Sequence, residues 1–167
     1  MVMRFFSLIL AGLVWMMAVP AVEAAPLATL PGLGGVFAGS RPDNLGVQAG
    51  KLAPCPESPN CVSSQVEDAE HAIAPFTYSQ DRDIARDTLV KVLQNQPRTQ
   101  LLDQADDYVY VEFTSKLMGF VDDAEFYFPA DSKTIEVRSA ARLGESDLGV
   151  NRRRLEQIRL ALADLGA

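Results

Sequence analysis

The stretch between residues 99 and 140 carries the pattern that most constrains the fold. In its clearest part, apolar side chains alternate with tyrosine or polar ones: Tyr108, Val109, Tyr110, Val111, Glu112 and Phe113. A period of two residues is typical of a strand with one buried face. Short polar connections separate successive runs, as hairpin turns require. The pattern predicts four antiparallel strands, at residues 99–103, 108–115, 120–128 and 134–140.

Two amphipathic helices flank these strands. Residues 81–94 have apolar side chains at helical spacing, with Asp81 as a candidate N-cap. Residues 147–165 carry a second apolar stripe, which Ser146 or Asp147 can cap. Residues 71–78 are predicted as a further short strand. The simplest burial places both helices on one face of the sheet, which predicts an α+β fold with an antiparallel sheet of about four to five strands.

The chain ahead of this region is rich in glycine and proline. Residues 26–59 hold six residues of each type, which predicts an extended N-terminal arm over residues 25–52 and a single domain over residues 53–167. The arm is either an exposed linker or is docked on the domain through Leu45, Val47 and Leu52.

Residues 1–24 have the features of a secretory signal peptide. Arg4 precedes an uncharged, mostly apolar run at residues 5–19, and small residues favour cleavage after Ala24. The alternative is an uncleaved anchor, which would then be the protein's contact with the membrane. The 15 apolar residues are few against the roughly 20 that span a bilayer. We expect an exported protein of the periplasm or cell envelope of a bacterium.

Export bears on the two cysteines. In an oxidising compartment Cys55 and Cys61 are expected to form a disulfide that staples a short proline-rich loop. A redox role is the alternative, but thioredoxin-type pairs have two intervening residues and this pair has five.

Composition argues against several classes of function. A net charge of −7 disfavours nucleic acid and anionic lipid surfaces as partners. Two cysteines and one histidine do not suffice for a Cys/His zinc cluster, and we predict no cofactor and no metal. Ser63, Ser64 and His71 lack the pattern of a hydrolase, so we expect loop-capping hydroxyls and a solvated imidazole.

Acidic and basic residues are concentrated in different segments of the remaining chain. Residues 103–136 hold nine carboxylates against two lysines, whereas residues 138–159 hold six arginines against three carboxylates. Strand alternation directs Asp123, Glu125 and Arg138 away from the helices, although a bulge would exchange Asp122 and Asp123. This face is either a solvated surface with internal ion pairs or a polar pocket suited to acid–base chemistry or to a hard cation such as calcium.

Arginines also open the last predicted helix. Arg152, Arg153 and Arg154 lie where the helix dipole disfavours cations. Either the acidic sheet compensates them, or they attract an anion or carboxylate-bearing ligand to the helix N-terminus. Arg138, Arg142 and Asn151 are candidates to join such a site.

Four segments resemble a known family. They read RPDNLGV at residues 41–47, CPESPNCVSSQ at 55–65, GFVDDAEF at 119–126 and RSAARLGESDLGVNR at 138–152. On these segments the chain, from about residue 41 to its end, is similar to domain-of-unknown-function family 1499. The resemblance implies a protein found behind export or membrane segments, without an established activity. It points to candidate binding residues inside the segments: Asn60, Ser63, Ser64, Asp122, Asp123, Glu125, Arg138, Ser139, Arg142, Asp147, Asn151 and Arg152.

We therefore expect a binding domain that recognises a small ligand, a lipid or a protein partner. One alternative is a hydrolase-like envelope enzyme that uses Asp122, Asp123 or Glu125 with Arg138 and Arg142. Another is a structural or assembly role. Geometry separates these hypotheses. Carboxylates that converge in a concave pocket with raised pKa values favour chemistry, whereas carboxylates paired with arginines on a flat surface favour binding or structure.

Overall fold

The computed structural model describes residues 35–166. The predicted signal peptide and the first part of the predicted arm, residues 25–34, lie outside the described residues. The elements in chain order are β1 (Cys61–Ser63), β2 (Phe76–Thr77), α1 (Arg82–Gln94), β3 (Thr99–Gln104), β4 (Tyr108–Thr114), β5 (Val121–Tyr127), β6 (Thr134–Ala141) and α2 (Val150–Asp164). No helix within residues 35–166 is long and apolar enough to cross a membrane.

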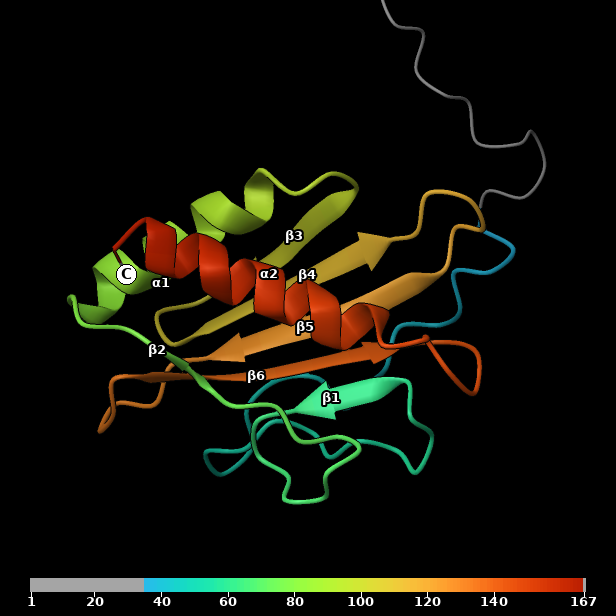
Figure 1. Cartoon of the computed structure of the whole chain (residues 1–167), viewed down its shortest axis with the longest axis horizontal. Coiled ribbons are helices and arrows are strands. Elements are labelled where there is room, and N and C mark those ends of the chain that lie inside the picture. Colours follow the sequence, from blue (N-terminus) through green and yellow to red (C-terminus); the bar gives the residue numbers. More distant parts are fainter. Residues whose placement is uncertain (1–34, 167) are drawn as a thin grey trace, which may run out of the picture.

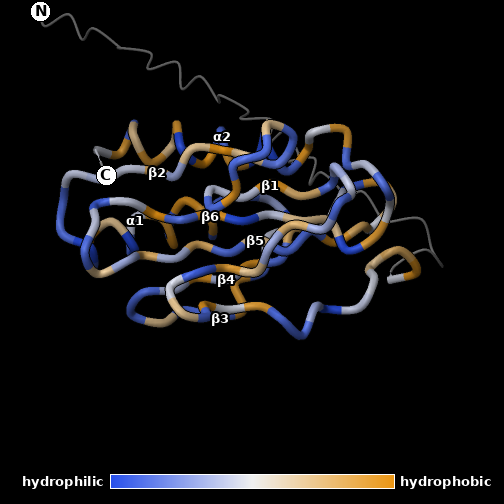
Figure 2. The backbone as a smooth tube through the Cα atoms, turned by 90° about the horizontal axis from the view of Figure 1, so that it is seen from below, coloured by the Kyte–Doolittle hydropathy of each residue, from blue (hydrophilic) through white to orange (hydrophobic). Residues whose placement is uncertain are grey.

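The strands form one antiparallel sheet in the order β1-β6-β5-β4-β3, and β2 pairs with the other half of β6. Both helices cover the same face of this sheet (Figure 1). Hydrophobic and hydrophilic residues alternate along α2 and the central strands (Figure 2). The apolar members of this alternation, among them Val109, Phe126, Leu89 and Leu155, are fully buried between the two layers. The predicted α+β fold is confirmed.

Two local predictions are wrong. The strand predicted at residues 71–78 is limited to Phe76 and Thr77, and β1 at Cys61–Ser63 was not predicted as a strand. The second helix begins at Val150 because Leu148 and Gly149 have positive φ angles of 55° and 74°, which end helical geometry. Asp147 still accepts hydrogen bonds from the backbone N–H groups of Gly149 and Asn151, at 2.9 and 2.7 Å.

The described part of the predicted arm, residues 35–52, passes behind the sheet, on the side opposite the helices (Figure 1). Leu52 is buried there against Tyr108 and Tyr110, and Leu45 and Val47 pack beside it. The sheet therefore has a second, smaller apolar cluster under this segment. The outer face of the sheet is covered here rather than solvated.

Candidate functional site

The outer face of the sheet holds a set of paired charges, here called the outer-face cluster: Glu112, Asp123, Glu125, Arg138 and Arg142. Glu125 is fully buried. Its Oε1 accepts hydrogen bonds from the Tyr108 hydroxyl at 2.8 Å and from the Gly46 backbone N–H at 2.7 Å. Its Oε2 lies 3.2 Å from Arg138. The arm thus closes over this carboxylate.

Asp123 and Glu112 are cross-strand neighbours that share one arginine. Arg142 donates to both Asp123 oxygens, at 2.9 and 2.7 Å, and also contacts Glu112. The Tyr110 hydroxyl donates to Asp123 at 2.5 Å, and Arg41 in the arm lies 2.6 Å from Glu112. Every carboxylate of the cluster therefore has a cationic partner.

Proton affinities in the cluster follow from these contacts. Burial and the carboxylates beside them raise the pKa of both Tyr108 and Tyr110. Burial works to raise the pKa of Glu112, but the hydrogen bonds from Arg142 and Arg41 outweigh it and lower that pKa. Neutral phenols and an ionised, paired carboxylate do not make an acid–base pair near neutral pH. By the criterion set out above, this geometry favours binding or structure over chemistry.

Three further predicted residues, Asn60, Ser139 and Asn151, lie at the junction of β1, β6 and α2. Asn60 donates to the Gly144 carbonyl oxygen at 2.5 Å, and the Ser139 hydroxyl donates to the Asn151 side chain at 2.5 Å. Asn151 in turn donates to the Asn60 carbonyl oxygen at 3.3 Å. Asn60, Ser139 and Asn151 are buried. These bonds fix the loop that leads from β6 into α2.

Asp122 faces the helices, unlike Asp123. Its side chain pairs with Arg154 of α2, with 2.8 Å between the Arg154 Nη2 and Asp122 Oδ2 atoms. Asp122 is only 6% exposed, and burial raises its pKa while Arg154 works in the opposite direction. Asp122 lines a cavity of about 160 Å³, here called the end pocket, whose lining is Ser115, Phe120, Asp122, Ala141, Leu143, Gly144, Ser146, Asp147 and Val150.

The end pocket combines an apolar wall with hydrogen-bond acceptors. Phe120, Leu143 and Val150 supply the apolar surface. The Asp147 oxygens are occupied by backbone N–H groups, whereas none of the residues at 35–166 donates a hydrogen bond to Asp122 Oδ1. All lining residues except Ser115 lie in the segments at 119–126 and 138–152. The pocket is where these two segments meet.

The predicted joint anion site is not assembled. Arg138 and Arg142 lie on the outer face, whereas Asn151 and Arg154 lie on the helix side of the sheet. Arg152 donates to the carbonyl oxygens of Ala72 and Glu70, at 2.6 and 2.8 Å, and so ties down the loop before β2. The sheet separates the two groups of arginines.

Ser63 and Ser64 support loops. Ser63 Oγ accepts from the Gln65 backbone N–H at 3.2 Å, and Ser64 Oγ donates to Glu136 at 2.6 Å. The imidazole of His71 is not solvated, contrary to expectation. It is buried, with Nδ1 2.6 Å from Asp68 and Nε2 3.2 Å from the Ser58 carbonyl oxygen. Burial works to lower the pKa of His71, but these two partners outweigh it and raise that pKa.

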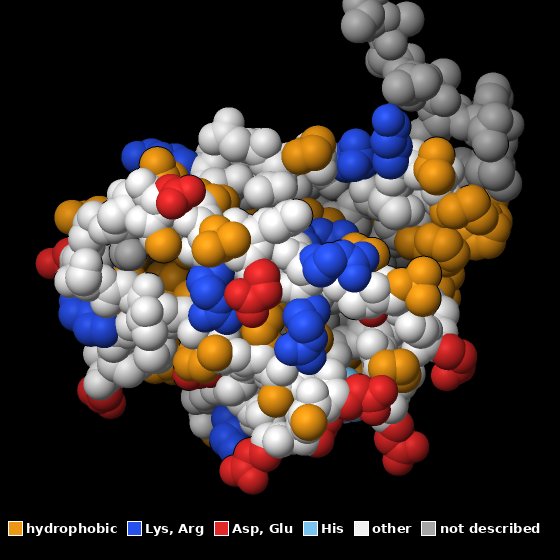
Figure 3. Space-filling model, viewed as in Figure 1, with side chains coloured by type: hydrophobic (Ala, Val, Ile, Leu, Met, Phe, Trp, Pro, Cys, Tyr) orange, Lys and Arg blue, Asp and Glu red, His pale blue; other side chains and the backbone are white. Residues whose placement is uncertain are grey.

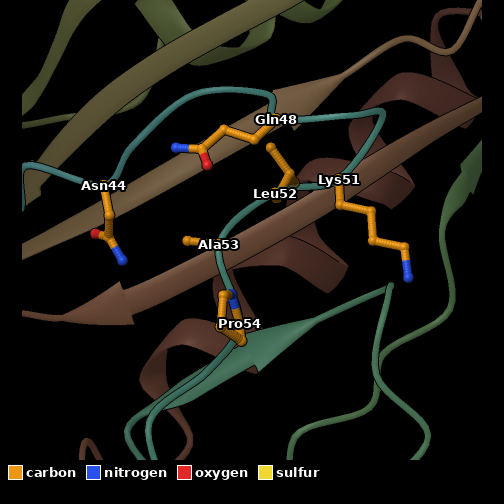
Figure 4. A pocket seen from close by; sticks show the side chains of 6 residues that line it. All are labelled: Asn44, Gln48, Lys51, Leu52, Ala53 and Pro54. Atoms are coloured by element: carbon orange, nitrogen blue, oxygen red, sulfur yellow. The ribbon is translucent and has the colours of Figure 1, made fainter.

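Cys55 and Cys61 form the predicted disulfide. It joins the end of the arm to β1, whose Cys61 pairs with Ala140 of β6. Near this point a hollow of about 300 Å³ lies along the arm (Figure 4). Its lining comes from residues 44–54 alone, and Lys51 is the one ionisable side chain among them. The hollow therefore lacks the convergence of separate segments that the end pocket has.

Sequence reasoning missed Arg154 as the partner of Asp122, together with Phe120, Leu143 and Val150. The spacing of Arg154 in α2 gave no signal, because its partner lies in a strand 32 residues earlier. Within residues 35–166, no group of three or more histidine, cysteine, aspartate or glutamate side chains could hold a metal ion.

Comparison with protein families gives one match, to the family described as "Protein of unknown function (DUF1499)", over residues 51–162. Comparison with curated proteins gives no match. The matched region runs from the end of the arm through most of α2 and includes the end pocket and the whole outer-face cluster. Because it covers more than half of the chain, the protein belongs to the DUF1499 family.

Proposed function

We propose that the protein is a binding domain of the cell envelope whose end pocket holds a small amphiphilic ligand. The observation that carries the proposal is the nine-tenths-buried Asp122 in an apolar-lined cavity. A pocket with a mostly apolar wall and a few placed polar groups is the usual form of a small-molecule site. The disulfide and the N-terminal sequence support an oxidising compartment outside the cytoplasm.

The lining selects the chemistry of the ligand. Asp122 offers a hydrogen-bond acceptor with negative charge, so the matching group on the ligand is an ammonium or a hydroxyl. A volume of about 160 Å³ accommodates one ring or a short alkyl group, since a cavity of about 150 Å³ binds benzene. A carboxylate ligand would bring like charge against Asp122 and is disfavoured.

Three compounds of one shape test this selection: benzylamine, benzyl alcohol and benzoate. Each is titrated into the protein, and the backbone amide resonances of Asp122, Leu143 and Val150 are followed by NMR. We expect benzylamine and benzyl alcohol to shift these resonances and benzoate to leave them in place. Benzoate binding as tightly as benzylamine would refute the proposed polarity of the site.

Two variants tie the binding to the pocket. Asp122→Asn removes the charge and is expected to weaken benzylamine binding about tenfold or more. Ala141→Leu fills the cavity without changing any charge and is expected to abolish binding of both ligands. Glu145→Gln, an exposed acid outside the lining, is the control and should bind as the parent does. Unchanged binding in both pocket variants would remove the end pocket as the site.

A further inference from the structure

One end of the domain gathers exposed apolar side chains. Six of the nine large hydrophobic residues that are exposed within residues 35–166 are Val36, Leu117, Met118, Leu143, Leu148 and Val150. They come from the start of the described chain, from the β4–β5 loop, from the β6–α2 connection and from the first residue of α2. In Figure 3 hydrophobic side chains gather at the right-hand end of the molecule, where the grey trace joins it. We call this surface the apolar end.

Single exposed hydrophobic residues are ordinary, but several from separate segments on one surface indicate an interaction site. Leu117 is 78% exposed and Leu148 is 84% exposed. Leu148 also has a φ of 55°, a conformation that costs an L-residue energy and is tolerated better by asparagine or aspartate. The fold thus retains an apolar side chain in a strained and largely exposed position, which packing inside the domain does not explain.

Two further observations indicate what this surface meets. Arg98, Lys116 and Arg153 stand beside or within the same loops, and none of them has a carboxylate partner in the described part of the chain. The acids of the same loops are Glu145 and Asp147, so the three cations leave this rim with a local excess of positive charge although the whole chain carries a net charge of −7. Apolar tips with a basic rim match the interface of a bilayer that contains anionic lipid.

The position of the N-terminal part of the described chain agrees with a membrane at this end of the domain. The ring of Phe37, near the start of the described chain, lies 5.2 Å from that of Phe120 in the β4–β5 loop. Fifteen residues of sequence separate the apolar run at residues 5–19 from the first described residue, a reach of at most about 50 Å. The described chain, which follows the predicted signal segment, thus begins at the apolar end.

We propose that the apolar end docks on the surface of a lipid bilayer, with Leu117, Met118 and Leu148 inserted among the lipids. The docked orientation places the mouth of the end pocket at the membrane interface, since Phe120 and Leu143 belong both to its lining and to the loops that carry the surface. The proposal does not rest on the identity of the pocket's ligand. It assigns a role to Leu117, Met118 and Leu148, which do not line the end pocket.

Hydrogen exchange tests the docking on protein isolated from the cell that makes it. Backbone amide exchange is compared with and without vesicles of equal parts phosphatidylcholine and phosphatidylglycerol. We expect exchange in the loops at 115–120 and 142–149 to slow at least several-fold when vesicles are present, while exchange in α1 is unchanged. Equal slowing in both regions, or none in the loops, would overturn the proposal.

A matched pair of double variants isolates the surface. Leu117→Asp with Leu148→Asp is expected to remove the protection, because each charge opposes insertion. Leu160→Asp with Leu165→Asp changes two similarly exposed leucines, 64% and 60% exposed, one in α2 and one at its C-cap, and should leave the protection intact. Equal behaviour of the two pairs would contradict the assignment.

Sedimentation and ligand binding separate the remaining outcomes. A dimer in solution that Leu117→Asp with Leu148→Asp converts into a monomer would assign the surface to a second copy of the chain and overturn membrane docking. Neither of these two residues lines the end pocket, so benzylamine binding should persist in that variant. Benzylamine binding without loop protection would support the proposed function and refute the membrane docking. Loop protection without benzylamine binding would support the membrane docking and refute the proposed function.

Discussion

Arg142→Met is expected to lower the free energy of unfolding of the domain much more than the loss of an ordinary surface ion pair does. The Arg142 side chain is 7% exposed, and its guanidinium serves Asp123, which is 1% exposed, and Glu112, which is 12% exposed. The methionine side chain fills a similar space but leaves Asp123 with the Tyr110 hydroxyl as its remaining side-chain donor, beside a second carboxylate across the strand pair. Removing one partner of a buried ion pair costs about 3–5 kcal/mol.

The assay is urea unfolding followed by far-ultraviolet circular dichroism. With an m-value of about 2 kcal/mol/M, the transition midpoint falls by about 2 M. Domains of this size have a total stability of about 5–15 kcal/mol, so the variant is expected to be folded but marginal. Arg86→Met is the control, because the Arg86 partners Asp83 and Asp87 are 68% and 55% exposed. Its cost should stay below about 1 kcal/mol.

The pH dependence gives an independent check of the same cluster. The folded-state pKa of Glu112 is lowered, so its contribution to stability is present above its unfolded-state pKa and is lost as pH falls through the folded value. The difference between Arg142→Met and the parent should therefore shrink in strong acid. A cost below about 1 kcal/mol at neutral pH, equal to that of Arg86→Met, would refute the interpretation of this cluster as a buried, structural one.

Two further outcomes are expected. Replacing Cys55 and Cys61 by alanine should lower the free energy of unfolding by about 2–3 kcal/mol, because the disulfide closes a short loop in the unfolded chain, and the same urea titration measures this. The pKa of His71 is raised, so its contribution to stability is present below its unfolded pKa and is lost as pH rises through the folded value. Urea titrations at about pH 5.5 and about pH 8.5 should show this loss in the parent and a much smaller one in Asp68→Asn; the same loss in both proteins would contradict the His71–Asp68 pairing.

The strands and their faces were predictable because residue alternation determines side-chain direction once one face is known to be buried. Val109, Val111 and Phe113 indicated the helix side of β4, and the hairpin connections carried that assignment to Glu125 and Arg138. The start of α2 was not predictable from Asp147, because the left-handed turn at Leu148 and Gly149 depends on backbone geometry rather than on capping preference. β1 was missed since a strand of three residues is too short to show a periodicity of its own.

The grouping of the candidate site residues was only partly predictable from the sequence. Sequence patterns placed Asp123, Glu125 and Arg138 together, since they share one face of neighbouring strands. They also placed Arg138 and Arg142 with Asn151, and this grouping is divided by the sheet. Long-range pairing such as that of Asp122 with Arg154 depends on how α2 crosses the sheet, which the helix pattern alone does not determine.

The adjacent aspartates at 122 and 123 show how a structural carboxylate differs from one that is a candidate for ligand binding. Both are nine-tenths buried, yet they point to opposite faces of β5 and meet different demands. Asp123 accepts three hydrogen bonds from Arg142 and Tyr110, so both of its carboxylate oxygens are paired within the fold. Asp122 has one cationic partner, Arg154, and lines the end pocket, and its Oδ1 atom accepts no hydrogen bond from residues 35–166. Asp122 Oδ1 is not among the buried side-chain atoms that lack a partner in the described residues, so it is accessible to an ammonium or hydroxyl donor that enters the pocket. The acidic sequence of the sheet therefore contains one residue suited to a ligand and several that hold the scaffold around it.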